Sequence, residues 1–400
     1  MLGLVWALYA SFGLITTTIP PLVGPIVDDL GLTYSQMGLI LGAWQLVYIA
    51  AAFPLGTLID RLGVRRSLAI GIVVVWISLI LRGAAVDFWT LFLSVALFGL
   101  GGPIISIGAP KVVALWFGQN ERGIAAGVYA TGPVIGMAAA LATASSLVMP
   151  LVGTWRGISL VYGAIVLLVV VAWWLLARDT PSPSPQPEKG SVPTVPGRTT
   201  QPSLIRMRNV QVLLVMATAT FLLNHGLNNW GPTLLRESGM TLSQSGVWMA
   251  VGTAIGAIGL LVFPVLARYG YRAMMMGLLL AAAAVSTAGL VLLHGPMLVA
   301  ALVVSSMARM SMMPILILIL METPGVGPAR MGSAGGLFFA AAEIGGFGGS
   351  FLLGVLRDAT GSLTSGAMTL AAVSAALILA VPLLQERRKP QPLDQGIKSS

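Results

Sequence analysis

The segment 31–38 reads Gly31-Leu32-Thr33-Tyr34-Ser35-Gln36-Met37-Gly38, and the segment 239–246 reads Gly239-Met240-Thr241-Leu242-Ser243-Gln244-Ser245-Gly246. The two segments share glycine, threonine, serine, glutamine and glycine at an offset of 208 residues. A Gly-Pro pair precedes each of them, and the offset of 208 recurs between Arg122 and Arg330 and between Gly127 and Gly335. The chain therefore contains an internal duplication, and we expect its two copies to share one architecture.

The composition places both copies in a lipid bilayer. Hydrophobic residues make up 56% of the chain, charged residues 9%, and the mean hydropathy is +0.91. A water-soluble domain of this composition would expose large apolar patches. The sequence has no cysteine, which excludes disulfides and thiolate chemistry. The net charge of +9 comes from basic residues in short connections and tails, so we expect a bilayer and not nucleic acid as the partner, and no cofactor or metal.

Twelve apolar stretches, each about long enough to cross a bilayer, follow one another along the chain. They are 3–27, 36–58, 67–86, 90–116, 122–149, 157–177, 209–234, 244–266, 273–293, 296–321, 331–356 and 364–385. The fold class is therefore an all-α membrane protein with twelve transmembrane helices in two pseudo-symmetric six-helix bundles. We expect bundles over 1–177 and 209–386, a Pro/Ser/Thr-rich linker over 178–208, and a tail over 387–400.

The basic residues predict the orientation of the chain. Sixteen of them fall in one set of alternate connections and in the tail, whereas the opposite connections hold Arg82, Arg156, Arg236 and Arg357. Because cytoplasmic loops carry the excess of Lys and Arg, we expect both termini and the linker to be cytoplasmic. The N-terminus has no basic region before its apolar run, so we interpret it as the start of the first span. The expected location is a bacterial inner membrane, with the protein as a multi-pass integral component.

The connection between the second and third spans carries a recognisable motif. It reads Gly56-Thr57-Leu58-Ile59-Asp60-Arg61-Leu62-Gly63-Val64-Arg65-Arg66 and resembles the signature loop of the major facilitator superfamily. The resemblance implies the major facilitator fold and a conformational latch made by Asp60, Arg61, Gly63, Arg65 and Arg66. The alternative is that Arg65 and Arg66 only anchor the topology. The second copy has Ala267 where the carboxylate would stand, so the latch is expected to be asymmetric.

Further motifs resemble one part of this superfamily. Ala109-Pro110-Lys111, Trp116-Phe117-Gly118, Glu121-Arg122-Gly123 and Asn229-Trp230-Gly231-Pro232 are similar to segments of the nitrate, cyanate and related small-solute permeases. The arginines that those carriers place within spans 1, 2 or 8 are absent from 3–27, 36–58 and 244–266. In the fifth span, Gly127 to Gly136 resembles the superfamily's glycine-proline motif and predicts a kinked helix that a neighbour approaches closely.

Ionisable side chains within the spans are candidate functional groups, because burying an unpaired charge in a bilayer costs several kcal/mol. Arg309 lies midway along the tenth span, which lines the central cavity in the superfamily, and we expect it to hold an anionic group of the substrate. The alternative is a structural ion pair with Glu343 in the eleventh span. Glu343 is also our candidate for proton coupling, since a substrate that competes for Arg309 would change its ionisation.

The densest polar cluster within a span surrounds His225 and includes Asn224 and Asn228. We expect these three residues to bind substrate, because histidine and amides offer both donors and acceptors. The alternative is hydrogen bonding between helices. Lys111, Gln45 and Tyr48 complete the predicted substrate site, with snorkelling to the interface as the alternative for Lys111.

Together these features predict a secondary transporter that moves a small organic or inorganic anion by alternating access. The expected partners are this small molecule, with a proton or counter-substrate, and the lipid bilayer. One alternative is a proton-coupled efflux carrier for a cationic or amphiphilic solute, and a distant one is a membrane sensor without flux. An enzyme is not expected, since the sequence has neither a His-Glu-x-x-His run nor a nucleophile elbow, and it lacks the phosphate loop of a primary pump.

Overall fold

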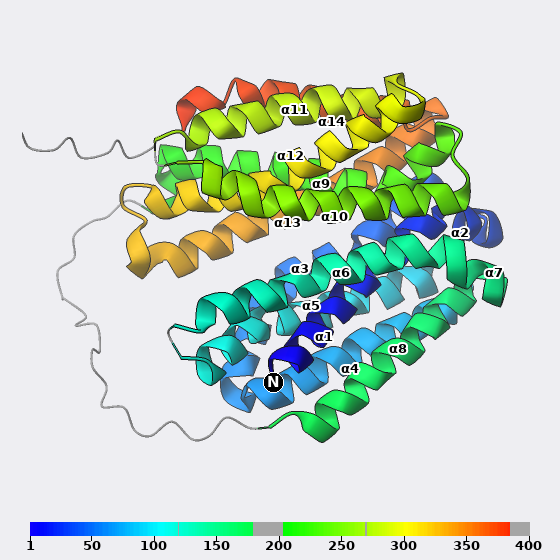
Figure 1. Ribbon diagram of the computed structural model, residues 1–400, viewed down its shortest axis with the longest axis horizontal. Helices are drawn as coiled ribbons and strands as arrows, with labels where there is room; N and C mark the ends of the chain where they lie inside the picture. The colour runs from blue at the N-terminus through cyan, green and yellow to red at the C-terminus, as the bar shows by residue number, and fades with distance from the viewer. Residues whose placement is uncertain (119, 179–202, 269, 385–400) are drawn as a thin grey trace, which may run out of the picture.

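The computed structural model of the chain describes residues 1–118, 120–178, 203–268 and 270–384, excluding the side chains of 52, 53, 56, 57, 60 and 327–329. It consists of two helical bundles that lie side by side, one from each copy of the duplication (Figure 1). The N-terminal half contains α1 to α8 and the C-terminal half α9 to α14. Of the predicted linker 178–208, the structure describes 178 and 203–208, and the predicted tail 387–400 lies outside the described residues.

The helices of the N-terminal half are α1 (Leu2–Thr16), η1 (Pro20–Leu22), α2 (Val23–Leu30), α3 (Tyr34–Leu62), α4 (Val64–Gly83), α5 (Phe88–Trp116), α6 (Arg122–Thr143), η2 (Ala144–Val148), α7 (Met149–Val152) and α8 (Trp155–Leu176). Those of the C-terminal half are η3 (Leu204–Arg206), α9 (Arg208–Glu237), α10 (Leu242–Leu266), α11 (Arg272–Leu292), α12 (Gly295–Glu322), α13 (Gly327–Thr360), α14 (Thr364–Ile378) and η4 (Val381–Leu383).

Eleven helical segments among the described residues are long and apolar enough to cross a membrane, and they coincide with eleven of the predicted spans. The twelfth predicted span, 36–58, lies within the 29-residue helix α3. The predicted fold class is therefore confirmed. Two details differ from the prediction. The first span is interrupted after Thr16, where Pro20 begins a short 3-10 turn, and Arg82 is buried in the last turn of α4 instead of lying in a connection.

The duplicated segment builds the same helix start twice. Gly31 and Gly239 have φ angles of +62° and +94°, a region that favours glycine. Thr33 then accepts a hydrogen bond from the backbone N–H of Gln36, whose side chain accepts one from the N–H of Thr33, at the start of α3. Thr241 and Gln244 form the same capping box at the start of α10. The repeated sequence is therefore a helix-initiation signal.

Glycines allow the backbones of paired helices to touch within each half. A methyl group on Gly132 or Gly136 of α6 would overlap backbone atoms of α1. In the C-terminal half the corresponding pair is Gly345 and Gly349 of α13, which face the backbone of α9. Such small-residue contacts supply the close packing that replaces a hydrophobic driving force in lipid. The expectation of a closely approached fifth span is thus confirmed.

The two halves touch each other at one end of the molecule. We call it the opposite end, because it lies across the molecule from the end that carries Arg61, Arg65, Arg66 and Arg122. There Gly38 of α3 meets the backbone of Ser350 and Phe351 in α13, and Gly246 of α10 meets the carbonyl of Leu141 in α6. Ser145 in η2 also donates a hydrogen bond to the carbonyl of Leu242, at 3.0 Å. The helices α3, α13, α6 and α10 therefore close the opposite end.

At the other end, which we call the basic end because Arg61, Arg65, Arg66 and Arg122 lie there, the halves separate. Methyl groups placed on Gly123 and Gly127 of α6, or on Gly332 and Gly336 of α13, would meet no atom within 4 Å. These glycines belong to the same two helices that carry contacts further along. The molecule is therefore open between its halves at the basic end and closed at the opposite end.

Candidate functional site

A cavity of about 670 Å³ lies between the two halves. Helices α1, α3 and α5 contribute Tyr9, Tyr48 and Ser106, whereas α13 contributes Phe339 and Glu343. Tyr48 hydrogen-bonds Ser106 through the two hydroxyl groups at 3.2 Å, and Tyr9 donates to the Ser106 carbonyl at 3.0 Å. The wall from the N-terminal half is thus a hydrogen-bonded aromatic surface, and Glu343 is the one charged residue among the described lining residues.

Polar residues from both halves meet about one helical turn N-terminal to Tyr48 in α3. Gln45 Nε2 lies 3.2 Å from His225 Nδ1 of α9, and this contact joins the two halves. The ring of Trp44 lies edge-on to His225, with 5.8 Å between the centroids. A methyl group on Gly346 would lie 2.9 Å from His225 Cδ2 and 3.3 Å from Glu343 Oε2. The side chains of His225 and Glu343 therefore both lie next to Gly346. The predicted residues Gln45, Tyr48, His225 and Glu343 therefore come together.

Arg309 lies behind this surface, between α12 and α9, and only 2% of its area is exposed. Its Nη1 donates to the carbonyl and Oδ1 of Asn224, at 3.3 and 3.2 Å, and to Oδ1 of Asn228 at 3.1 Å. Its Nε donates to the hydroxyl of Ser305 at 3.2 Å. All these acceptors are neutral, so within the described structure the guanidinium is hydrogen-bonded but its charge is not compensated.

The ion pair between Arg309 and Glu343, which the sequence left open as an alternative, is absent among the described residues in this conformation. Instead Glu343 Oε2 is buried without a hydrogen-bond partner, as is Gln45 Oε1. Asn228 is half-buried; its Oδ1 accepts from Arg309, and the described residues offer its Nδ2 no acceptor. Buried polar atoms without a partner, such as the oxygens of Glu343 and Gln45, are typical of a site that binds water or a ligand.

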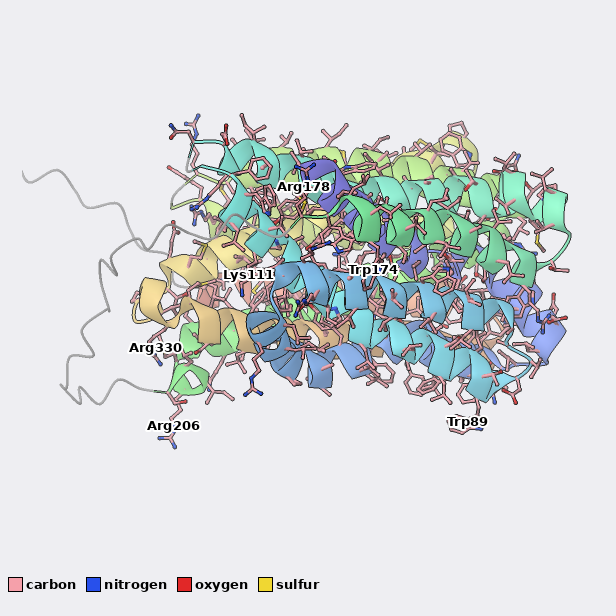
Figure 2. The ribbon with its side chains drawn as sticks, turned by 90° about the horizontal axis from the view of Figure 1, so that it is seen from below. Trp89, Lys111, Trp174, Arg178, Arg206 and Arg330 are labelled. Carbon is pink, nitrogen blue, oxygen red and sulfur yellow. The ribbon has the colours of Figure 1, made fainter. Side chains whose placement is uncertain are left out.

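Lys111 is not part of this cluster. It lies toward the basic end of α5 and lines a different hollow, together with Arg65, Arg66 and Arg178 (Figure 2). At the end of the first predicted span, the hydroxyl groups of Thr16, Thr17 and Thr18 donate hydrogen bonds to backbone carbonyls of α1. The structure thus brings six of the seven predicted substrate-binding residues, and Glu343, to mid-length of the helices, and places Lys111 at the basic end.

The sequence profile of the Major Facilitator Superfamily matches residues 5–350. The chain belongs to this superfamily. It is 30% identical over 155 residues to the "Probable L-galactonate transporter" of Escherichia coli, covering 38% of this chain and 34% of that protein. It is 26% identical over 260 residues to the "Hexuronate transporter" of Bacillus subtilis, covering 62% of this chain and 59% of that protein. The chain thus spans between about a third and three fifths of these curated relatives.

The same fold occurs in a solved structure of a bacterial homologue of the human lysosomal transporter Spinster, described as inward-facing and occupied. The TM-score is 0.77 at 17% identity, with 96% of this chain and 95% of that chain covered. Superfamily membership supports the expectation of a transporter and not an enzyme.

The superfamily's signature loop lies at the basic end. Gly63 separates α3 from α4 with φ at +79°, which explains the glycine at this position. Arg61 and Arg66 are exposed and Arg65 is half-buried, whereas the Asp60 side chain lies outside the described residues. In the C-terminal half, Arg272 forms an ion pair with Glu322 of α12 at 2.6 Å. In the second copy, therefore, the start of α11 is joined to the end of α12 by this ion pair, and the acid is Glu322 of α12.

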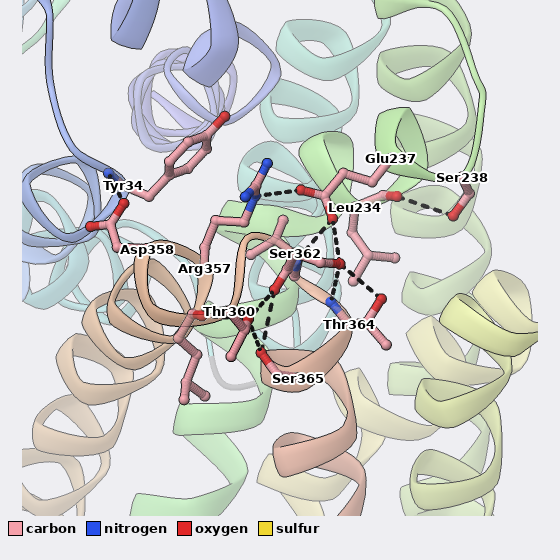
Figure 3. A network of polar contacts seen from close by, with 12 residues as sticks. Tyr34, Leu234, Glu237, Ser238, Arg357, Asp358, Thr360, Ser362, Thr364 and Ser365 are labelled. Atoms are coloured by element: carbon pink, nitrogen blue, oxygen red, sulfur yellow. Dashed lines mark hydrogen bonds and ion pairs between the residues drawn. The ribbon is translucent and has the colours of Figure 1, made fainter.

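A separate network of polar contacts joins the two halves at the opposite end of the molecule (Figure 3). Asp358, in the last turn of α13, accepts hydrogen bonds from the backbone N–H groups of Tyr34 and Ser35 at the start of α3, at 2.9 and 2.7 Å. Beside it, Arg357 lies over the Tyr34 ring at 4.7 Å and pairs with Glu237 of α9 at 2.6 Å. A carboxylate from one half thus caps a helix of the other half.

Several site residues escaped the sequence reasoning. Tyr9, Ser106 and Phe339 line the cavity but are ordinary aromatic and hydroxyl residues in apolar spans. Arg82 was assigned to a connection, yet it is 2% exposed, donates to the carbonyl of Ile15 at 2.8 Å and lies 5.8 Å from the Phe98 ring centroid. Its position near the end of the predicted stretch 67–86 gave a charge count but no sign of burial.

Proposed function

We propose that this chain is a secondary transporter that moves a small organic anion, of the hydroxylated sugar-acid class, by alternating access. The halves and the cavity between them supply the machinery that such transport needs. The relatives named for galactonate and hexuronate support the anion class, since these substrates carry one carboxylate and several hydroxyl groups.

The observation that carries the proposal is the uncompensated charge of Arg309. A buried guanidinium with neutral partners is several kcal/mol less stable than one that faces an anion. Asn224 and Asn228 hold it next to the surface of α9, where His225 and the free Nδ2 of Asn228 offer hydrogen bonds to hydroxyl groups. A substrate carboxylate that approaches α9 is attracted by Arg309 and is oriented by these amides.

Glu343 fits a proton-coupling role in the same proposal. An ionised carboxylate in the cavity would repel an anionic substrate, whereas a protonated one would not. Binding of the anion and binding of the proton therefore favour each other, and the coupling is reciprocal. We expect affinity for the anion to rise as the pH falls, and a Glu343→Gln variant to have lost most of this pH dependence.

Ligand-induced thermal stabilisation of the purified protein tests the anion site. We expect L-galactonate or D-galacturonate to raise the unfolding temperature, and Arg309→Gln to weaken the apparent affinity by at least about 30-fold. The matched control is Arg82→Gln, which also removes a buried arginine, but one that is not among the residues lining the cavity. It should lower stability and leave the ligand shift in place. If Arg309→Gln retains the full shift for every anion that binds, the proposal fails.

The lining of the cavity also favours a second candidate, a proton-coupled carrier of a cationic or amphiphilic solute. Glu343 would then hold the cation among Tyr9, Tyr48 and Phe339. The two candidates predict opposite pH dependences, because a cation needs the ionised carboxylate. Rising affinity with rising pH, abolished in Glu343→Gln, would select the cation carrier over the anion carrier.

We propose further that the basic end faces the cytoplasm, so that the structure represents a cytoplasm-facing state. The concentration of Arg and Lys at this end supports the assignment. In vesicles of known orientation, an antibody against a C-terminal tag should bind only inside-out vesicles. Binding to right-side-out vesicles would reverse the assignment.

A further inference from the structure

The two tyrosine hydroxyl groups on the cavity wall direct their protons away from the cavity. Tyr9 donates to the carbonyl of Ser106 at 3.0 Å. The hydroxyl of Ser106 donates to the carbonyl of Pro103, one turn earlier in α5, at 3.2 Å. Because a serine hydroxyl has a single proton, its contact with Tyr48 at 3.2 Å leaves Tyr48 as the donor. Each tyrosine oxygen therefore presents lone pairs to the cavity and no proton.

Neighbouring aromatic rings hold both tyrosines in this orientation. Trp44 lies edge-on to Tyr48 in α3, with 6.0 Å between the ring centroids. Tyr129 of α6 lies edge-on to Tyr9 at 5.3 Å, and Phe12 stacks on Tyr9 at 6.3 Å. Side chains that are locked by packing and by hydrogen bonds keep a fixed geometry when a ligand binds. The direction of the two hydroxyl groups is therefore a built feature of the wall.

The other described side chains that line the cavity add no neutral donor. Apart from Glu343 they belong to Ile49, Ile107, Gly336, Phe339 and Ala340. An ionised Glu343 adds two more acceptor oxygens, and a protonated Glu343 carries one proton, which is the coupling proton of the proposed function. The donors of the proposed anion site, Arg309 and the amide of Asn228, lie toward α9 instead. The space between the halves thus has a donor side and an acceptor side.

We propose that Tyr9 and Tyr48 select the end of the substrate that points away from Arg309, and that Ser106 is the positioning residue that orients the Tyr48 hydroxyl. This selectivity rests on the proposed function, in which the carboxylate of the substrate lies toward α9. A hydroxyl group at the far end can donate to the tyrosine oxygens. A second carboxylate there has only acceptors, and it would be repelled by the tyrosine oxygens and by Glu343. The substrate class is therefore polyhydroxy monocarboxylates, and dicarboxylates are rejected.

Two acids that differ only at one end test this selectivity in the purified full chain. L-galactonate ends in a hydroxymethyl group, and galactarate ends in a second carboxylate. Their affinities are measured from the dependence of the unfolding temperature on ligand concentration. We expect the unmodified chain to bind L-galactonate at least about 10-fold more tightly than galactarate. Tyr48→Phe removes an acceptor, so it should weaken the binding of L-galactonate about 2- to 10-fold without weakening that of galactarate.

Variants of Ser106 change the direction of the Tyr48 proton without removing either tyrosine. Ser106→Ala frees this proton to point into the cavity, where it can meet a carboxylate, so the variant should bind galactarate more tightly. Ser106→Thr retains the hydroxyl and should keep the preference of the unmodified chain. The matched control is Tyr162→Phe, which removes a tyrosine hydroxyl that hydrogen-bonds Thr143 at 2.8 Å in the same half but does not line the cavity. It should leave both affinities unchanged.

Three results would overturn the selectivity while both acids still bind. They are equal affinities of the unmodified chain for the two acids, a parallel loss of both acids in Tyr48→Phe, and an unchanged preference in Ser106→Ala. A parallel loss would show a structural effect of the tyrosine, since such an effect does not distinguish the two ligands. In these cases the proposed transport of anions stands. If neither acid binds to the unmodified chain, the proposed function fails, and the selectivity fails with it.

Discussion

Asp358 is expected to control how often the opposite end opens. Its carboxylate supplies acceptors for the first two N–H groups of α3, which the capping box of Thr33 and Gln36 leaves unpaired. It also accepts from the Ser35 hydroxyl at 2.5 Å. Because Asp358 belongs to the other half, these three hydrogen bonds exist only while the opposite end is closed.

The size of the effect follows from measured helix caps. Removal of a capping side chain costs about 0.5–2 kcal/mol. Asp358 is exposed to solvent, which keeps the value within that range. Asp358→Ala should therefore shift the equilibrium toward opening of this end about 2- to 30-fold. A negative charge is unfavourable in the last turn of α13, so the overall stability of the C-terminal half should not fall.

The absence of cysteine allows a reporter to be placed at a single site. Ser145→Cys is suitable, since Ser145 is 5% exposed and contacts α10 across the closed end. The rate of its reaction with a membrane-impermeant thiol reagent should rise about 2- to 30-fold in Asp358→Ala. Two controls apply. Asp87→Ala removes a carboxylate cap within one half and should leave the rate unchanged. Ser94→Cys, buried inside the N-terminal half, should stay unreactive. An unchanged rate at Ser145→Cys, or a parallel increase at Ser94→Cys, would refute the reasoning.

Two further predictions concern stability. Gly136→Ala should destabilise the protein by about 1–3 kcal/mol, because the new methyl group overlaps the Ala10 carbonyl. Gly127→Ala in the same helix meets open space and should be neutral or slightly stabilising; thermal unfolding that ranks the two equally would contradict the packing. Hydrogen bonds from Thr90 lower the pKa of Asp87, so its contribution is present above the unfolded pKa and is lost as the pH falls through the folded value. Unfolding temperatures between pH 6 and 3 should therefore drop less in Asp87→Asn than in the unmodified chain, and an equal drop would contradict this.

The sequence predicted the fold from local features. Hydropathy located the spans because a bilayer requires long apolar helices. The repeated Thr-x-x-Gln segments indicated the duplication, and the structure shows that they also form the capping boxes at the starts of α3 and α10. Errors arose where a charge lay near a span boundary. Arg82 was misplaced because length and composition do not show whether a terminal arginine turns inward to the Ile15 carbonyl.

The candidate site was predicted only in part. Arg309, Glu343 and His225 were identified because they are charged or titratable residues at bilayer depth. The depth of a residue follows from its position along its own helix, which the sequence gives. Their partners depend on the rotation and approach of other helices. Only the packed structure shows that Asn224 and Asn228 hold Arg309, that Glu343 faces the cavity alone, and that Lys111 lies with Arg178 at the basic end.

By itself, the sequence determined the duplication, the membrane class, the spans and the intramembrane charges, because each of these is a periodic or compositional property of a short segment. The tertiary structure decided which end is closed, which charges are compensated and which half caps the other. Asp358 illustrates the difference. It is an unremarkable acid near a helix end in the sequence, and it becomes the cap of α3 only because α13 crosses to the other half.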